Sequence, residues 1–385
     1  MKVIPYGRQY IDNTDILSVA HSLKQDLITT GAYVKKFENK INQLVSSKYA
    51  ISCSSGTSGL HLALLAIDLK SNDVVIMPAI NFIASYGMAK KMNAKIYLAD
   101  VDPLSGQMTP ETLNNCINKN KLKKIKAIIT MPMGGYPENI EEFFKIKSLF
   151  KCRLIEDACH AMGAQYSVKN FFYYTGSCKH SDIAVFSLHP LKTITSGEGG
   201  IVTTNNKIFY KKMISFRSHG IQRKDATHWK YNIVKLGYNY RLSDLNCALA
   251  LSQLKKITKF IKNRKKIYQN YTVGLKKFKN IFKFYEYDKK NKPSYHLSLI
   301  SINFKKNGSN KQKLISFLNK HKIICQYHYI PIYKLKIYKK KINKKYFQGA
   351  EYYYKNSLSL PIFYSLNSSM QKKILSKIIQ FFKLK

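Results

Sequence analysis

The stretch Asp182–Gly200 reads DIAVFSLHPLKTITSGEGG, and the rest of the chain can be interpreted around it. A buried apolar run ends at Ser187, a histidine-proline turn follows, and Lys192 then precedes a glycine-rich loop, where neither a helix nor a strand requires it. Lysine forms Schiff bases with aldehyde cofactors when its surroundings make it nucleophilic. The chain has 65 lysine and arginine residues, most of which must be solvated, so Lys192 alone does not establish a catalytic site.

A second segment, Cys152–Ala164 (CRLIEDACHAMGA), strengthens this interpretation. A short apolar strand ends there in Glu156 and Asp157, and His160 follows three residues later. A pyridoxal ring needs an acid against its pyridine nitrogen so that the protonated ring can act as an electron sink, and Asp157 could supply it. A single acidic pair more commonly caps a helix. The two stretches together therefore favour a cofactor site.

With these motifs the chain resembles the DegT/StrS-type sugar aminotransferases, which are fold-type I enzymes that use pyridoxal phosphate (PLP). The blocks that carry the resemblance are 54–63 (SSGTSGLHLA), 78–84 (PAINFIA), 156–164 (EDACHAMGA), 186–200 (FSLHPLKTITSGEGG), 217–220 (RSHG) and 237–244 (GYNYRLSD). They occur in family order, and a weaker resemblance continues to the C-terminus. The resemblance implies a large PLP-binding α/β domain over residues 1–255, with a mainly parallel seven-stranded sheet, and a smaller α+β domain over residues 256–385.

The pattern of the chain itself points to the same α/β architecture. Strands are expected at 48–53, 74–77, 95–99, 127–131 and 152–157, with an amphipathic helix at 12–27 and an apolar helix at 60–69. Later in the chain we expect a helix from 243 to 266, a strand at 297–304, a helix at 311–321 and a strand at 323–329. Strands that alternate with helices indicate a parallel sheet with ligands at the carboxyl ends of the strands. Thr57, Phe82, Asp157 and Ser187 all follow such ends.

The resemblance assigns cofactor roles to several of these residues. It implies that Lys192 holds PLP as a Schiff base, that Asp157 meets the ring nitrogen, and that His160 orients the phenolic oxygen of the ring or Asp157. It further implies that Phe82 stacks on the ring and that the phosphate is held by Gly56, Thr57, Ser58 and Ser187. A small-residue turn that opens a helix does offer free N–H groups at the positive end of the helix dipole. Most such turns are only caps, and most phenylalanines belong to the core.

The resemblance also implies a set of substrate-binding residues: Tyr6, Asp26, Leu27, Ile28, Thr29, Gly56, Ser187, Asn239, Gln326, Tyr327, His328 and Tyr329. From their own sequence, residues 26–29 could equally be an ordinary helix exit, and His328 could be a packed histidine among tyrosines. Asn239 matches a family asparagine that reaches the partner's cofactor across a dimer interface. The resemblance therefore implies an obligate homodimer with shared active sites.

Within the family, the segments 216–220, 241–245, 251–256 and 328–333 are most similar to the enzymes of pseudaminic acid synthesis. This implies transfer of an amino group from L-glutamate to the 4-keto carbon of a UDP-linked 6-deoxy N-acetyl sugar. The product would be UDP-4-amino-4,6-dideoxy-N-acetyl-beta-L-altrosamine. The chain departs from that pattern between Gln222 and Lys235, including Trp229, so keto-sugar nucleotides of the bacillosamine, legionaminic acid or perosamine type remain alternatives.

The formal net charge of +44 could indicate a nucleic acid or an anionic membrane as partner. The lysines are scattered among abundant Ile, Asn and Tyr, as codon bias would produce, and no nucleic-acid motif occurs, so we expect neither partner. A non-catalytic anion-binding protein on the same fold is the remaining alternative, and the presence of both Lys192 and Asp157 argues against it. Seven cysteines without a Cys-x-x-Cys pair predict no metal site and a reducing cytoplasm, and no apolar run approaches a membrane span.

Overall fold

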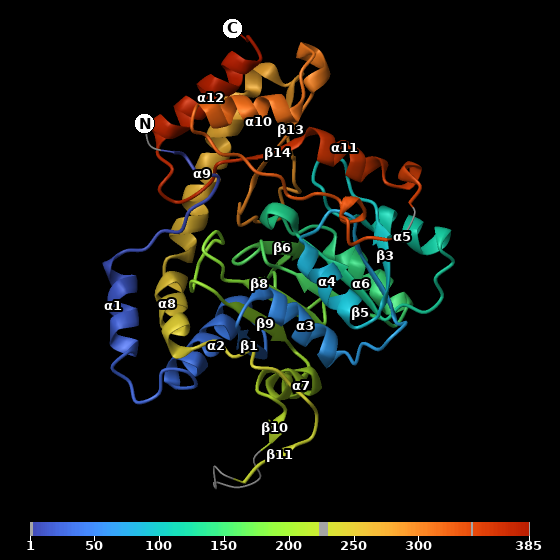
Figure 1. Cartoon of the computed structure of the whole chain (residues 1–385), viewed down its shortest axis with the longest axis vertical. Coiled ribbons are helices and arrows are strands. Elements are labelled where there is room, and N and C mark those ends of the chain that lie inside the picture. The colour runs from blue at the N-terminus through green and yellow to red at the C-terminus, as the bar shows by residue number, and fades with distance from the viewer. Residues whose placement is uncertain (1–2, 223–229, 340–341, 385) are drawn as a thin grey trace.

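A computed structural model of the chain describes residues 3–222, 230–339 and 342–384 (Figure 1). At its centre lies a seven-stranded sheet with the strand order β1-β9-β8-β5-β4-β2-β3. The strands are β1 (Tyr49–Cys53), β2 (Val74–Pro78), β3 (Lys95–Ala99), β4 (Ala127–Thr130), β5 (Arg153–Asp157), β8 (Ile183–Ser187) and β9 (Gly200–Thr204). Strands β8, β5, β4, β2 and β3 pair in parallel, and β9 alone opposes its neighbours. The prediction of an α/β fold with a mainly parallel seven-stranded sheet is confirmed.

Helices cover both faces of this sheet, because its strands are apolar on both sides, as parallel sheets require. On one face lie α3 (Gly56–Ala66), α4 (Ile83–Lys91) and α7 (Lys207–Arg217). On the other face lie α2 (Ala32–Val45), α5 (Pro110–Lys119), α6 (Ile140–Leu149) and α8 (Asp244–Leu254). Neighbouring residues of β5 show the division, since Ile155 packs with the first group and Leu154 with the second.

The C-terminal part is built on a second, antiparallel sheet (Figure 1, upper part). Its strands are β12 (Phe282–Phe284), β13 (Ser298–Ile302) and β14 (Ser357–Leu360), and its helices are α9 (Ile257–Gly274), α10 (Lys311–Lys320), α11 (Gln348–Asn356) and α12 (Ser368–Phe381). The N-terminal segment also belongs here, because Ile4 is buried in the core of this part and pairs with Ile323. The division of the chain near residue 255 stays a prediction. Two small hairpins, β6 (Gln165–Val168) with β7 (Phe171–Tyr174) and β10 (Ile221–Gln222) with β11 (Asn232–Ile233), complete the described strands.

Besides the helix expected at 12–27, which is shorter, three expected elements differ in the structure. The helix expected at 60–69 already begins at Gly56, because Ser55 and Ser58 cap it reciprocally. The helix expected from 243 to 266 is interrupted at residues 255–256, which separate α8 from α9. The prediction of a strand at 323–329 is wrong. Its pairing partner changes from Ile4 to Ser359 within three residues, so the segment forms only two isolated bridges. Trp229 lies outside the described residues. Among the described helices none is long and apolar enough to cross a bilayer.

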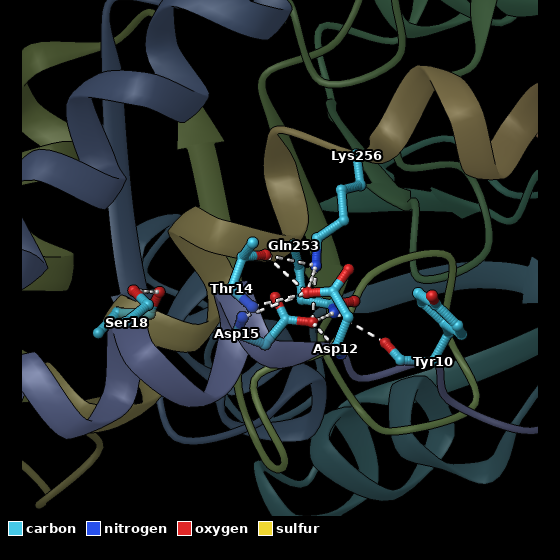
Figure 2. Close-up of polar contacts among 8 residues, drawn as sticks. Tyr10, Asp12, Thr14, Asp15, Ser18, Gln253 and Lys256 are labelled. Atoms are coloured by element: carbon cyan, nitrogen blue, oxygen red, sulfur yellow. Dashed lines mark hydrogen bonds and ion pairs between the residues drawn. The ribbon is translucent and has the colours of Figure 1, made fainter.

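Helix α1 (Asn13–Ser22) is held by a polar clamp instead of an apolar face (Figure 2). The ammonium of Lys256 lies 2.7 Å from both the Asp12 and the Asp15 carboxylate, and Gln253 donates to Asp15 at 2.7 Å. Asp15 is fully buried. The hydrogen bond from Lys256, followed by that from Thr14, lowers the pKa of Asp12 to about 2.

The apolar face of α1, which the sequence suggested for packing, is exposed instead. This predicted face consists of Ile16, Val19, Ala20 and Leu23, and both Ile16 and Leu23 are 58% exposed. The presence of this helix could be predicted from the sequence, although it ends at Ser22 and not near residue 27. The face by which the helix is attached could not be predicted.

We expect Lys256→Ala to destabilise the protein by about 3 kcal/mol, because it removes the cation that compensates a buried carboxylate. For a chain of this size that corresponds to a fall of roughly 4 °C in the midpoint of thermal unfolding. The neighbouring exposed Lys255 supplies the control, and Lys255→Ala should leave the midpoint unchanged. Because pairing depresses the pKa of Asp12, its part of the stabilisation should persist above about pH 4 and disappear as the pH falls towards 2. Equal midpoints for the two variants at pH 7 would show that the clamp does not stabilise the fold.

Candidate functional site

A cavity of about 680 Å³ lies at the edge of the large sheet where its parallel strands end. Among the residues that line it are the following predicted from sequence: Tyr6, Gly56, Thr57, Phe82, Asp157, His160, Ser187, Lys192, Gln326, Tyr327, His328 and Tyr329. These residues come from segments more than 300 positions apart, so their meeting is a product of the fold. The structure thus brings most of the predicted site into one place.

The strand ends account for this convergence. Asp157 ends β5, Ser187 ends β8, Gly56 follows β1 as the first residue of α3, and Phe82 follows β2 as the N-cap of α4. The antiparallel strand β9 starts at this same edge, where Gly200 pairs with both Cys53 and Ser187. A Cβ on Gly200 would come within 2.4 Å of the Ser55 carbonyl oxygen, so only glycine lets the two segments approach.

Asp157 presents one unpaired oxygen in this cavity. It is 2% exposed, its Oδ2 accepts a hydrogen bond from Ser85 at 2.7 Å, and its Oδ1 is buried without a partner. The preceding carboxylate, Glu156, accepts from Ser181 at 2.5 Å and does not line the cavity, and burial raises its pKa to about 7. Of the acidic pair, only Asp157 can receive a hydrogen bond from a ligand here.

Lys192 lies in the turn that follows β8, where its backbone N–H donates to the His189 carbonyl at 2.9 Å. Burial lowers the pKa of Lys192, and the nearby Cys159 and Asp157 oppose this shift. Burial, followed by the charge of Lys192, holds the pKa of His160 well below its usual range. The cavity therefore contains a lysine with lowered basicity and a neutral imidazole, together with the unpaired oxygen of Asp157.

The N-terminus of α3 forms another side of the cavity. Gly56 and Thr57 are its first helical residues, so their N–H groups have no acceptor within the helix. Ser58 is not brought into the cavity, because its hydroxyl accepts from the Ser55 N–H at 2.9 Å and donates to the Ser55 carbonyl at 2.8 Å. An anion such as a phosphate group fits this helix end. Together with Asp157 and Lys192, these residues fit PLP.

The wall opposite the sheet is formed by Tyr6 and the segment from Gln326 to Tyr329. His328 is both packed and in the cavity wall: it is buried, its Nδ1 lies 2.7 Å from the Ser359 hydroxyl, and its ring lies 5.7 Å from that of Tyr6. From the sequence, His328 could be either a packed histidine or a residue of the binding site, and in the structure it is both packed and in the cavity wall.

Several predicted residues do not reach this cavity: Asp26, Leu27, Ile28, Thr29 and Asn239. Thr29 lines a different cavity of about 460 Å³, together with Arg217 and Arg241. Asn239 pairs with Ser218 and is exposed. The carboxylate of Asp244, at the start of α8, accepts the N–H groups of Gly31, Tyr33 and Val34, and its own N–H donates to Ile28. The loop before α2 is therefore a separate region that Asp244 anchors, and Asn239 lines neither of these two cavities.

Three further residues at the cavity were missed in the sequence. Ser85 holds Asp157, and its place three residues after Phe82 in the first turn of α4 could have indicated it. Asn81 is 2% exposed, lines the cavity and has neither amide atom hydrogen-bonded. His296 packs 4.4 Å from the His160 ring, and no local pattern relates two residues so far apart in sequence. Within the described residues, no group of three metal-ligating side chains comes together.

The family of the chain follows from its similarity to known proteins. Residues 9–379 match the DegT/DnrJ/EryC1/StrS aminotransferase family. The UDP-4-amino-4,6-dideoxy-N-acetyl-beta-L-altrosamine transaminase of Campylobacter jejuni subsp. jejuni serotype O:23/36 (strain 81-176) is 34% identical over 367 residues, which cover 95% of this chain and 94% of that protein. The GDP-perosamine synthase of Escherichia coli O157:H7 is 31% identical over 386 residues, which cover 99% of both.

Solved structures give the same result. Helicobacter pylori PseC, an aminotransferase involved in the biosynthesis of pseudoaminic acid, superimposes with a TM-score of 0.89 at 28% identity, over 99% of this chain and 100% of that one. The PLP-form of Spr1654 from Streptococcus pneumoniae shares the fold with a TM-score of 0.88 at 22% identity, over 99% of both chains. The chain therefore belongs to the DegT/DnrJ/EryC1/StrS aminotransferase family and is a PLP-dependent aminotransferase.

Proposed function

We propose that this aminotransferase moves an amino group from L-glutamate to the 4-keto carbon of a UDP-linked 4-keto-6-deoxy N-acetyl sugar. One observation carries the reaction type: the Lys192 amine and the unpaired Asp157 oxygen lie at one cavity, beside the open N-terminus of α3. The sugar class rests on the 34% identity to the altrosamine transaminase. The 31% identity to a GDP-perosamine synthase keeps another keto-sugar nucleotide as the second candidate.

In this proposal PLP, when bound, supplies the electron sink and carries the amino group between the two substrates. Gly56 and Thr57 would bind its phosphate through their N–H groups, with Ser187 as a further hydroxyl donor, and Phe82 would stack on its ring. Asp157, held by Ser85, would keep the proton on the ring nitrogen. The Nζ of Lys192 would hold the cofactor, and its lowered pKa suits this amine to accept and return a proton at the reacting centre.

We further propose that the protein works as a homodimer in which each site is completed by the partner. Residues 26–29 and Asn239 lie outside the cavity of their own chain, although both groups resemble substrate or cofactor contacts of the family. Large apolar side chains are exposed near these groups, among them Leu27 at 57% and Leu236 at 88%. The hairpin β10–β11 extends away from the body beyond α7 (Figure 1). Burial against a second copy would remove this apolar surface from water.

We expect the purified enzyme to show a visible absorption band that L-glutamate bleaches and that Lys192→Ala abolishes, because that variant lacks the amine that binds the cofactor aldehyde. Lys179→Ala, which removes an exposed lysine that does not line the cavity, should keep both the band and the bleaching. A band that persists unchanged in Lys192→Ala would remove Lys192 from the proposed chemistry.

We expect the bleached band to return when a UDP-linked 4-keto-6-deoxy N-acetyl sugar is added, because the keto sugar takes the amino group back off the cofactor. The GDP-linked 4-keto-6-deoxy sugar without an N-acetyl group should restore the band at least tenfold more slowly. This factor corresponds to a difference of roughly 1.4 kcal/mol in activation free energy between the two sugars. The readout is absorbance against time, with identification of the amino sugar by mass spectrometry. Faster recovery with the GDP-linked sugar would favour the perosamine-type alternative.

We expect light scattering to give a mass near twice 44.5 kDa. Lys192→Ala and Asn239→Ala should each be inactive alone but recover activity when unfolded and refolded together. With random pairing, half of the dimers contain one of each chain and therefore one intact site, so about a quarter of the wild-type activity should return. No recovery, with both variants folded and dimeric, would mean that Asn239 acts in its own chain.

A further inference from the structure

The hydrogen bonds of His160 determine where its ring proton lies. The backbone N–H of Gly134 donates to His160 Nδ1 at 3.3 Å, so this nitrogen carries no hydrogen. The ring is neutral, since burial holds its pKa well below its usual range. Its single N–H must therefore be on Nε2.

This tautomer fixes the direction of the next hydrogen bond. His160 Nε2 lies 2.9 Å from the Tyr329 hydroxyl, and as the protonated nitrogen it is the donor of that bond. The Tyr329 oxygen accepts, which leaves the hydroxyl hydrogen of Tyr329 free. Tyr329 lines the cavity, and no second hydrogen bond of its hydroxyl occurs within the described part of the chain. The chain Gly134–His160–Tyr329 thus ends in an O–H donor beside the cavity.

The imidazole is held firmly in this orientation. Ser294 donates to the His160 carbonyl at 2.9 Å, and the His296 ring packs 4.4 Å from the His160 ring. Gly135, next to the donor Gly134, has a φ of +85°, and a Cβ there would come within 2.1 Å of the Ser294 hydroxyl. Only glycine allows this close contact between the two loops. A donor held in advance costs little reorganisation when a ligand binds.

The position of Tyr329 indicates which ligand atom it meets. Its ring lies 5.6 Å from that of Phe82, and its hydrogen-bond partner His160 follows Asp157 by three residues. With the ring nitrogen, the phosphate and the aldehyde of PLP assigned to Asp157, α3 and Lys192, the phenolic oxygen is the polar ring substituent that still lacks a partner. His160 cannot donate to this oxygen while its Nε2 proton is given to Tyr329.

We propose that the Tyr329 hydroxyl is the hydrogen-bond donor to the phenolic oxygen of PLP, and that His160 is the positioning residue that orients this donor. This replaces the expectation that His160 itself contacts the phenolic oxygen. The inference rests on the placement of the ring in the proposed function, between Phe82 and Asp157, but not on the identity of the sugar.

The test is Tyr329→Phe, which keeps the aromatic ring and removes the hydroxyl. Without its donor the phenolic oxygen becomes more basic, so the pH midpoint of the visible absorption band should rise by about one unit, and the Kd of the apoenzyme for PLP should rise about tenfold. Tyr338→Phe is the matched control, because Tyr338 packs near Tyr86 and does not line the cavity, and neither quantity should change. His160→Gln should shift the midpoint in the same direction but by less, since Tyr329 would keep its hydroxyl with a loosened orientation.

Three results would overturn the proposal. The first is an unchanged midpoint and Kd in a folded Tyr329→Phe enzyme. The second is a change confined to the KM for the sugar nucleotide, which would assign the hydroxyl to the substrate. The third is a larger shift in His160→Gln than in Tyr329→Phe, which would return the contact to His160. Circular dichroism and the unfolding midpoint establish that each variant folds. An enzyme with a normal band but no turnover of UDP sugars would instead refute the proposed substrate and leave this measurement intact.

Discussion

The buried carboxylate of Asp157 is the constraint on which the site depends. An ionised carboxylate removed from water is costly unless its oxygens are hydrogen-bonded, and here Ser85 bonds only one of them. The other oxygen requires a cationic or N–H partner from a ligand. The groups nearby suit this requirement, because burial lowers the pKa of Lys192 and keeps His160 neutral. The cavity therefore offers a buried, unpaired acceptor oxygen beside a lysine of lowered pKa and a neutral imidazole.

Those cavity residues that stand at strand ends could be predicted from the sequence. Those whose contacts depend on packing between distant segments could not. Asp157 and Ser187 follow apolar strands, and parallel strands place their carboxyl ends at one edge. His296 and the bond between His160 and Tyr329 join parts of the chain more than 130 residues apart, for which a single sequence has no periodic signal. Residues 26–29 were assigned by resemblance, and the single chain does not bring them to the cavity.

Acidic residues are scarce in this chain, and several of them join helices to one another. The chain contains 21 Asp and Glu residues against 65 Lys and Arg. Asp12 and Asp15 attach α1 to the junction of α8 and α9, and Glu38 pairs with Arg217 at 2.7 Å between α2 and α7. Most lysines need no partner because they are solvated. At these two joints between helices each carboxylate has a cation as partner, and in so basic a chain the loss of one such carboxylate is not readily replaced.

Asp244 illustrates a different use of a carboxylate, since all its partners are backbone N–H groups at the start of α2. Because these hydrogen bonds are made to the backbone, they do not depend on which side chains the loop before α2 carries. Substitutions at residues 26–29 can therefore accumulate without loosening the loop, provided that Asp244 and the turn at Gly31 persist. The fold thus separates the attachment of this loop from its side chains, so the sequence of the loop can change at little cost in stability.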